Sequence, residues 1–272
     1  MEIGVFAKII KRPRLSEVFE TVRRDGFSTV QFNMTCVGLP SLPDEIAPHL
    51  ILQIKEELFR HRLSMAALSG TFNMVHPDVK LRKKNMEKLL LLLSHCRTIG
   101  TPVVTLCTGT RNPDDMWTAH PDNHTREAWL DLCKTLEPIL SKAEEEQVIV
   151  AFEPEISNVV NSARKGKQLI DEMKSPSLKV VFDAANLFEH ATVSEVKKYI
   201  AEGIDMLGEH IVLVHAKDRT AEGKVIAAGK GIIPFDFYLQ TLKNKGIDVP
   251  LVAHGMEEDE CPGCFKFLQR FV

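Results

Sequence analysis

Residues 148–183 read VIVAFEPEISNVVNSARKGKQLIDEMKSPSLKVVFD, and this stretch decides the fold. It opens with an apolar run, VIVAF, and closes with another, LKVVF. Both runs are nearly continuous in apolar residues, which is typical of strands buried on both faces of a parallel sheet. Residues 163–173, which lie between them, have the spacing of an amphipathic helix. The stretch therefore predicts one strand–helix–strand unit with parallel strands.

Similar apolar runs recur along the whole chain. They begin at Ile3, Thr29, Ser64, Pro102, Val148, Leu178, Ile211 and Val249. Helical patterns occupy residues 15–25, 80–98, 126–146, 163–173, 193–207 and 235–245. Eight strand–helix units in a chain of this length predict an α/β fold of the (β/α)8 TIM-barrel type, with residues 1–272 forming a single TIM-barrel domain.

An open, doubly wound sheet is the alternative arrangement of the same elements. That fold usually carries a glycine-rich dinucleotide-binding turn after its first strand. Here Phe6, Ala7 and Lys8 follow the first apolar run instead. The closed barrel is therefore favoured.

Composition and charge limit the classes of partner. Hydrophobic residues make up 44% and charged residues 26%, and 34 Lys and Arg oppose 37 Asp and Glu, for a net charge of −3. A protein that grips a phosphate backbone usually has a basic surplus, so we expect no nucleic-acid partner. The longest apolar run, residues 89–93, is too short to cross a bilayer. With six scattered cysteines and no secretory pattern at Met1, we expect a cytoplasmic protein with reduced thiols and no membrane partner. A homo-oligomer stays open.

Four consecutive apolar runs in the C-terminal half end in an ionisable side chain. These side chains are Glu153, Asp183, His215 and His254. Because the carboxyl ends of barrel strands meet at one mouth, we expect the four to lie together. Two carboxylates and two imidazoles suit Mn²⁺, Co²⁺, Zn²⁺ or Fe²⁺ better than Mg²⁺. The pattern therefore predicts one divalent metal bound by all four.

Each of these residues also has an ordinary structural explanation. Glu153 and Asp183 stand where an acid can cap a following helix. His215 alone is more often a hydrogen-bonded core histidine, and His254 precedes Gly255 in a loop. Helix capping does not explain the two histidines, whereas a shared metal explains all four residues at once.

Several segments of the C-terminal half resemble those of a known superfamily. The segments are Ala151-Phe152-Glu153-Pro154-Glu155, Val181-Phe182-Asp183-Ala184-Ala185-Asn186, Val214-His215-Ala216-Lys217-Asp218, Gly229-Lys230-Gly231 and Pro250-Leu251-Val252-Ala253-His254. In them the chain resembles the xylose-isomerase-like TIM-barrel superfamily of sugar phosphate isomerase and epimerase type. The resemblance implies a metal held by Glu153, Asp183, His215 and His254, and a small carbohydrate substrate.

The chain departs from this superfamily at two positions. His254 stands where the superfamily usually has a glutamate, unless Glu257 or Glu258 takes that place. Asn186 stands where a histidine is frequent. In related ketose 3-epimerases two glutamates act as paired acid and base. His254 has a suitable pKa for acid–base work, but a histidine bound to metal is less available for proton transfer.

Other candidate residues lie in the loops expected at the mouth. We expect Asn186 and Lys217 to bind substrate, Arg111 to pair with a phosphate or carboxylate, and Trp117 to form an apolar wall. His120, in the same loop as Arg111, is a further candidate for substrate binding, and His76 for proton relay. The alternative for the loop residues is a surface role, with a salt-bridged arginine and a packed tryptophan. Cys261 and Cys264 have CxxC spacing without a second pair, which favours a structural role.

These features favour a divalent-metal-dependent isomerase or epimerase that acts on a small sugar, sugar phosphate or related polyol through an enediolate. Glu153 is the candidate base, with His254 or His76 as the acid on the other face. A dehydratase acting on an inositol or keto-sugar type of substrate would begin with the same proton abstraction. An endonuclease IV-like phosphodiesterase and a non-catalytic ligand-binding barrel also stay open. The acidic balance and the 10 histidines disfavour the phosphodiesterase.

Overall fold

Eight parallel strands surround one axis in the computed structural model, which describes residues 1–272. They are β1 (Ile3–Phe6), β2 (Thr29–Phe32), β3 (Ser64–Ser69), β4 (Val103–Cys107), β5 (Ile149–Glu153), β6 (Leu178–Asp183), β7 (Ile211–Arg219) and β9 (Leu251–Ala253). Neighbours in the chain pair from β1 to β6. Then β6 pairs with β7, β7 with β9, and β9 with β1, which closes the ring. The predicted (β/α)8 barrel is confirmed.

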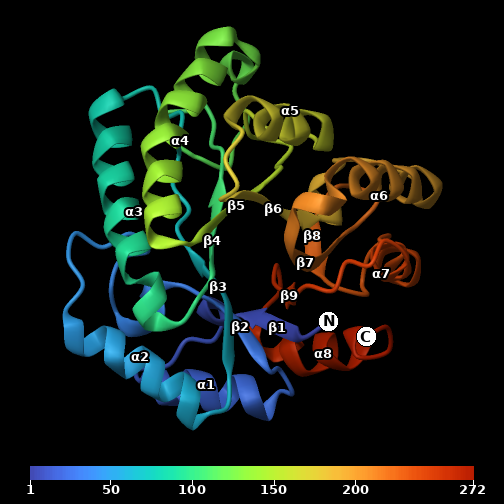
Figure 1. Cartoon of the computed structure of the whole chain (residues 1–272). Helices are drawn as coiled ribbons and strands as arrows, with labels where there is room; N and C mark the ends of the chain where they lie inside the picture. The colour runs from blue at the N-terminus through green and yellow to red at the C-terminus, as the bar shows by residue number, and fades with distance from the viewer.

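Eight helices form the outer layer around these strands (Figure 1). They are α1 (Leu15–Arg24), α2 (Pro48–Arg60), α3 (Val79–Ile99), α4 (Arg126–Glu146), α5 (Ala163–Met173), α6 (Val193–Leu207), α7 (Phe235–Asn244) and α8 (Cys261–Leu268). The sequence patterns located six of these helices to within a residue. They missed α2, whose buried stripe consists only of Ile51, Ile54, Glu57 and Leu58.

The seventh apolar run makes a longer strand than expected. β7 continues past His215 to Arg219, and the short strand β8 (Val225–Ala227) folds back against it as an antiparallel hairpin. In this hairpin Lys217 lies opposite Ala227. The extension carries Lys217 and Arg219 from the barrel wall into the rim of the mouth.

Two apolar clusters hold the layers together. A cluster of 69 buried residues lies between the strands and the helices. A separate cluster of eight small or medium side chains comes from the strands: Phe6, Ala66, Ala67, Val103, Ala151, Val181, Leu213 and Val252. Such a plug is what a small closed barrel requires, because its interior is a packed core and not a pore. A ligand can therefore enter only at the mouth.

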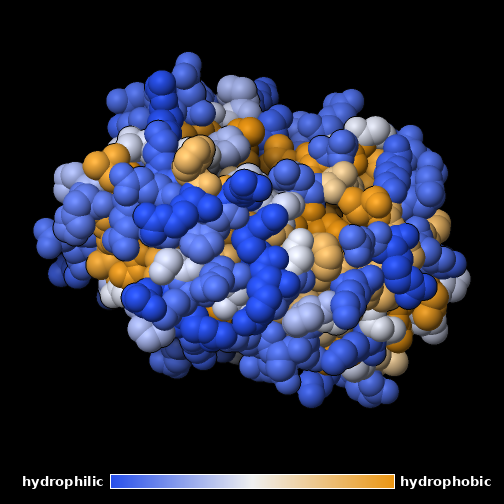
Figure 2. Space-filling model, turned by 90° about the horizontal axis from the view of Figure 1, so that it is seen from below, coloured by the Kyte–Doolittle hydropathy of each residue, from blue (hydrophilic) through white to orange (hydrophobic).

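One face of the molecule is mostly polar. The face seen in Figure 2 is mostly hydrophilic, with hydrophobic residues confined to separate patches. None of the helices is both long enough and apolar enough to traverse a bilayer.

Candidate metal centre

Glu153, Asp183, His215 and His254 converge at the mouth of the barrel. One donor atom from each lies within 4.8 Å of the donors of the other three. Glu153 ends β5, Asp183 ends β6, His215 lies in β7 opposite Asp183, and His254 follows β9. Because parallel strands deliver their carboxyl ends to the same edge, four strand-end residues meet here. The convergence expected from the sequence is present, while the binding of an ion stays a prediction.

The two histidines turn one nitrogen each toward the carboxylates. His215 Nδ1 lies 3.2 Å from Glu153 Oε1 and 3.8 Å from Asp183 Oδ2. His254 Nε2 lies 3.3 Å from Asp183 Oδ2. The ring centroids of the two histidines are 4.2 Å apart. Two imidazole nitrogens and two carboxylates thus surround one small volume, a donor set that suits a divalent transition metal.

A buried glutamine holds the outer ring nitrogen of His215. This nitrogen, Nε2, lies 2.8 Å from Gln31 Oε1, and Gln31 Nε2 donates in turn to Thr105 Oγ1 at 3.2 Å. Since an amide oxygen only accepts, Nε2 is the donor in this contact. Nδ1 is therefore the ring nitrogen that faces the carboxylates and is placed to bind a metal.

Lys217 adds a positive charge beside the acids. Its Nζ is 3.1 Å from Asp183 Oδ2 and 3.9 Å from Glu153 Oε1. Burial alone would favour the neutral forms, but Lys217 and the two imidazoles hold the pKa of Asp183 well below its usual range. The same carboxylates outweigh burial at Lys217 and raise its pKa above the usual value. Enclosure, with His215 alongside, lowers the pKa of His254 to about 4, so its imidazole is neutral at neutral pH.

The cluster lies in a cavity of about 550 Å³. Asn186 lines it and donates from Nδ2 to Glu153 Oε1 at 2.7 Å, whereas its buried Oδ1 has no partner. Glu155 also lines it, and burial, with a further contribution from Glu153, outweighs Lys217 and raises the pKa of Glu155 to about 7. Trp117 lies at the rim with 55% of its surface exposed. The cavity thus has the volume and the polar groups of a small-molecule site.

The family described as "Xylose isomerase-like TIM barrel" matches residues 19–262. The chain belongs to this family. The resemblance inferred from the strand-end motifs is therefore confirmed.

Solved structures repeat the same fold at low sequence identity. The 3-keto-D-glucoside 4-epimerase of E. coli has a TM-score of 0.80 and 13% identity, over 99% of both chains. The D-psicose 3-epimerase of Clostridium cellulolyticum H10, solved with D-tagatose, has a TM-score of 0.75 and 14% identity, over 100% of this chain and 99% of the other. An IOLI protein with a bound zinc atom has a TM-score of 0.74 and 16% identity, over 100% and 99%. No curated protein sequence matches the chain. At these identities the structural matches establish the fold alone.

Three of the predicted substrate residues line the cavity of this xylose isomerase-like barrel. They are Asn186, Lys217 and Trp117. Trp117 is positioned by its own turn, in which its backbone N–H donates to Asp115 Oδ1 at 3.0 Å. Their proposed roles in substrate binding stay predictions.

The other three predicted loop residues lie outside this cavity. His76 has both ring nitrogens engaged, Nε2 with Pro113 O at 3.1 Å and Nδ1 as acceptor from Asp78 N at 3.0 Å. Arg111 pairs with Asp131 Oδ2 at 2.8 Å and donates to Val75 O at 3.0 Å.

His120 Nδ1 accepts from Asp122 N at 3.2 Å and so caps the 3-10 helix η3 (Pro121–His124). The contacts of His76, Arg111 and His120 thus hold the loops in which these residues lie. Catalysis by His76 and substrate binding by Arg111 or His120 therefore form no part of the proposed function.

No glutamate replaces His254 at the eighth barrel strand. Glu257 is exposed, and Glu258 is engaged by Arg12, whose Nη1 lies 3.0 Å from Glu258 Oε2. Glu257 immediately precedes the short helix η6 (Glu258–Glu260), and Glu258 is its first residue. His254 itself therefore occupies the position that the superfamily usually gives to a glutamate.

The cavity residues that the sequence analysis did not single out include Glu155, Gln31, Arg219 and Lys8. Glu155 carried a usable signal, because residues two apart on an extended chain point to the same side. Gln31 is the one polar residue inside the run Val30-Gln31-Phe32. Lys8 and Arg219 have no comparable signal, since basic residues are common after strands.

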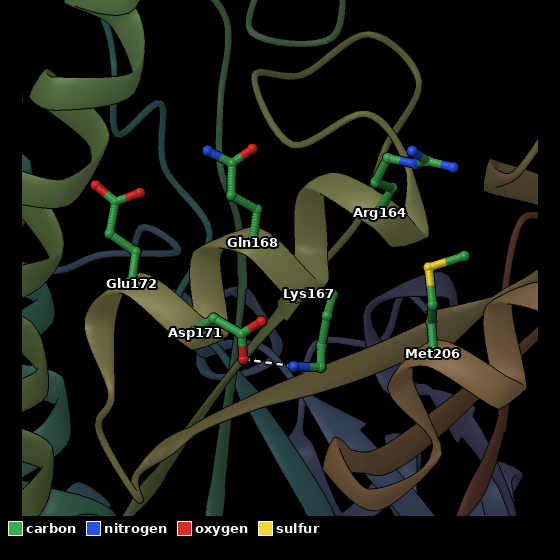
Figure 3. Close-up of a pocket in the computed structure, with 6 residues that line it drawn as sticks. All are labelled: Arg164, Lys167, Gln168, Asp171, Glu172 and Met206. Atoms are coloured by element: carbon green, nitrogen blue, oxygen red, sulfur yellow. Dashed lines mark hydrogen bonds and ion pairs between the residues drawn. The ribbon is translucent and has the colours of Figure 1, made fainter.

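Neither the CxxC pair nor a second pocket has the groups of a metal site. Cys261 and Cys264 are buried free thiols, and burial raises the pKa of each to about 12, which fits the expected structural role. An open pocket of about 580 Å³ lies on α5 and α6 (Figure 3). It is lined by Arg164, Lys167, Gln168, Asp171, Glu172 and Met206, with Lys167 and Asp171 paired to each other. It contains no group of metal-ligating residues.

Proposed function

We propose that this chain is a divalent-metal-dependent isomerase or epimerase of a small sugar, sugar phosphate or related polyol. The observation that carries the proposal is the convergence of four metal-type donors, within 4.8 Å of one another, in a cavity of small-molecule size. The fold supports it, since several structures of the same architecture are described as sugar epimerases.

The donor set fits a metal ion. Asp183 is ionised and the His254 imidazole is neutral, as metal ligands must be, and Gln31 holds His215 so that its Nδ1 faces the cluster. Two imidazoles favour Mn²⁺, Co²⁺, Zn²⁺ or Fe²⁺ over Mg²⁺. A bound divalent cation supplies Lewis-acid stabilisation of negative charge on two adjacent substrate oxygens.

Glu153 is our candidate for removal of the proton from carbon. The C–H electron pair becomes the C=C bond of an enediolate while the π pair of the substrate carbonyl moves onto its oxygen, and the proton moves to the carboxylate. Asn186 orients Glu153 through the 2.7 Å hydrogen bond to Oε1, and its unpartnered Oδ1 is free to accept from a substrate hydroxyl. Lys217 lies beside the same carboxylates, where its ammonium can stabilise charge on the substrate oxygens.

Return of the proton decides between the two products. Delivery to the neighbouring carbon gives an isomer, and delivery to the opposite face of the same carbon gives an epimer. We assign His254 to the metal because its Nε2 faces Asp183. Glu155 is the other carboxylate that lines the cavity, and it is our candidate for this second transfer.

The test combines metal analysis with hydrogen exchange. The purified protein is assayed for metal, stripped with a chelator, and reloaded separately with Mn²⁺, Co²⁺, Zn²⁺, Fe²⁺ and Mg²⁺. Each form is incubated in D2O with a panel of ketoses, aldoses and their phosphates, and proton NMR follows deuterium entering the carbon next to the carbonyl. We expect exchange with at least one sugar, dependent on the metal.

A matched pair of variants tests whether the four-residue cluster is responsible for metal binding and deuterium exchange. Asp183→Asn removes a buried donor and is expected to abolish metal retention and exchange. Glu257→Gln removes an exposed acid three residues from His254 and is expected to leave both unchanged. Absence of bound metal together with absence of exchange contradicts the proposal. Loss of water from the substrate identifies a dehydratase, and nicking of abasic DNA identifies a phosphodiesterase.

A further inference from the structure

Lys8 is the one cation lining the cavity that has no hydrogen-bond or ion-pair partner. Lys217 is paired with Asp183 and Glu153. Arg219 donates from Nε to Ala185 O and from Nη1 to Gly223 O, both at 2.8 Å. Lys8 makes no such contact, although it lines the same cavity. An ammonium group left free beside a binding cavity is available to a ligand.

The position of Lys8 is set by the first barrel strand. It lies in the short 3-10 helix η1 (Ala7–Ile9), immediately after β1, and so at the rim of the mouth. Its Nζ lies 4.4 Å from the centroid of the Phe6 ring, a cation–π arrangement that limits where the ammonium can go. The same Phe6 ring lies edge-on to His254, with 6.4 Å between centroids. The Lys8 ammonium and the His254 imidazole therefore both lie against the Phe6 ring.

The charge of the cavity favours a negative ligand once a metal is present. The carboxylates of Glu153 and Asp183, with Glu155 only partly ionised near neutral pH, face three cations, from Lys8, Lys217 and Arg219. A divalent ion then leaves the cavity with a net positive charge. The histidine at position 254 contributes to this excess, because a glutamate there would add a further negative charge. A positive cavity concentrates anionic ligands.

We propose that the sugar substrate carries an anionic group, a phosphate ester or a carboxylate, at the end remote from the metal, and that Lys8 binds it. This inference rests on the proposed function for the placement of the reacting carbons at the metal cluster. The anion-binding role predicted for Arg111 is not available, since Asp131 and Val75 O occupy that guanidinium. Lys8 is the remaining cation without a protein partner, and it lies against the same Phe6 ring as His254.

Calorimetry with matched ligands tests the proposal. The metal-loaded protein is titrated at low salt with D-xylulose, D-xylulose 5-phosphate and 2-keto-D-gluconate, and with inorganic phosphate alone. We expect at least one of the anionic sugars to bind about tenfold or more tightly than the neutral sugar, as for a hydrogen bond to a charged group. The two anionic sugars distinguish a phosphate ester from a carboxylate as the preferred group.

Variants distinguish a specific contact with Lys8 from the general attraction of anions to a positively charged protein surface. Lys8→Met is expected to reduce the preference for the anionic sugar to within about threefold, the range of an exposed charge pair. Lys8→Arg should restore the preference, and Lys11→Met, which removes an exposed lysine outside the cavity, should leave it unchanged. Inorganic phosphate should also bind more weakly to Lys8→Met.

Three results overturn the inference. They are equal affinity for the neutral and anionic sugars, an equal loss of both affinities in Lys8→Met, and no binding of any sugar. Phosphate binding that is independent of Lys8 also overturns it, because the metal alone then holds the anion. If neutral sugars undergo deuterium exchange and anionic sugars bind no more tightly, only this inference is contradicted. If anionic sugars bind more tightly but no sugar undergoes exchange, only the proposed isomerase or epimerase activity is contradicted.

Discussion

Replacing Gln31 by methionine is expected to weaken metal binding without altering any of the four donors. Gln31 Oε1 lies 2.8 Å from His215 Nε2, and it is the only side chain hydrogen-bonded to that nitrogen. Methionine has a similar length but is at best a weak acceptor. The substitution therefore removes the group that keeps the proton on Nε2 while preserving most of the packing.

The magnitude follows from the burial of both partners. Gln31 and His215 are each 3% exposed, so water cannot replace the lost acceptor. A buried donor left without a partner costs about 1–3 kcal/mol, equivalent to about 5- to 150-fold in an equilibrium constant. The imidazole can avoid this cost by moving its proton to Nδ1, but Nδ1 is then unable to bind metal. Loss of a hydrogen bond to a metal-ligating histidine typically weakens metal affinity by about 10- to 100-fold, which agrees with this range.

Competition with a fluorescent zinc chelator measures the affinity. Gln31→Glu is the conservative control, since its carboxylate can still accept from Nε2 and should retain wild-type affinity or exceed it. Thr105→Val removes the partner behind Gln31 and should cost less than Gln31→Met, because Oε1 keeps its acceptor role. Affinity of Gln31→Met within threefold of the wild type, with an unchanged melting temperature, would refute the reasoning. A lowered melting temperature with unchanged affinity would make Gln31 a purely structural residue.

Three further substitutions address the site, its rim and the loops. His254→Glu is expected to keep a metal bound and to shift the preference toward Mg²⁺ and Mn²⁺, because an oxygen donor replaces a nitrogen; an unchanged order of metal affinities contradicts this. Asp218→Ala should lower the free energy of unfolding in urea by about 3 kcal/mol or more, since four backbone N–H groups at 2.8–3.0 Å, two of them buried, lose their shared acceptor; a loss below 1 kcal/mol would argue against it. Asp131→Asn should destabilise the protein at neutral pH and match the wild type in acid. Although partial burial opposes ionisation, Arg111 and Arg82 hold the pKa of Asp131 below its usual range. The unfolded chain therefore binds the proton first, and the contribution to stability is lost as pH falls through the folded pKa. A difference in stability between Asp131→Asn and the wild type that persists at low pH would exclude the ion pairs of Asp131 as the source of the destabilisation.

The loop residues show where sequence reasoning reached its limit. The loop after β4 contains Arg111, Trp117 and His120, and sequence assigned all three to substrate. Only Trp117 lines the cavity. Arg111 is held by Asp131 of α4, and His120 caps the 3-10 helix η3. Asp131 lies 20 residues from Arg111, so nothing in the local sequence distinguishes an arginine held there from one left free.

The first half of the chain shows the same limit for the site itself. Gln31 and Lys8 have no motif around them, and neither was a candidate. Pairing of β1 with β9 brings Lys8 to the same mouth as His254, and the short reach across the barrel brings Gln31 to His215. The CxxC pair illustrates the converse, because absence of a second cysteine pair already indicated the structural role that burial supports.

The sequence by itself determined the barrel and the meeting of Glu153, Asp183, His215 and His254. Both depend on a local rule: continuous apolar runs make buried parallel strands, and parallel strands present their carboxyl ends at one edge. Tertiary structure alone decided the contact of His215 with Gln31, the unpaired ammonium of Lys8 and the engagement of Arg111. Each of these depends on which side chains meet across the closed barrel or between neighbouring helices, and such contacts join residues from 20 to 184 positions apart in the chain.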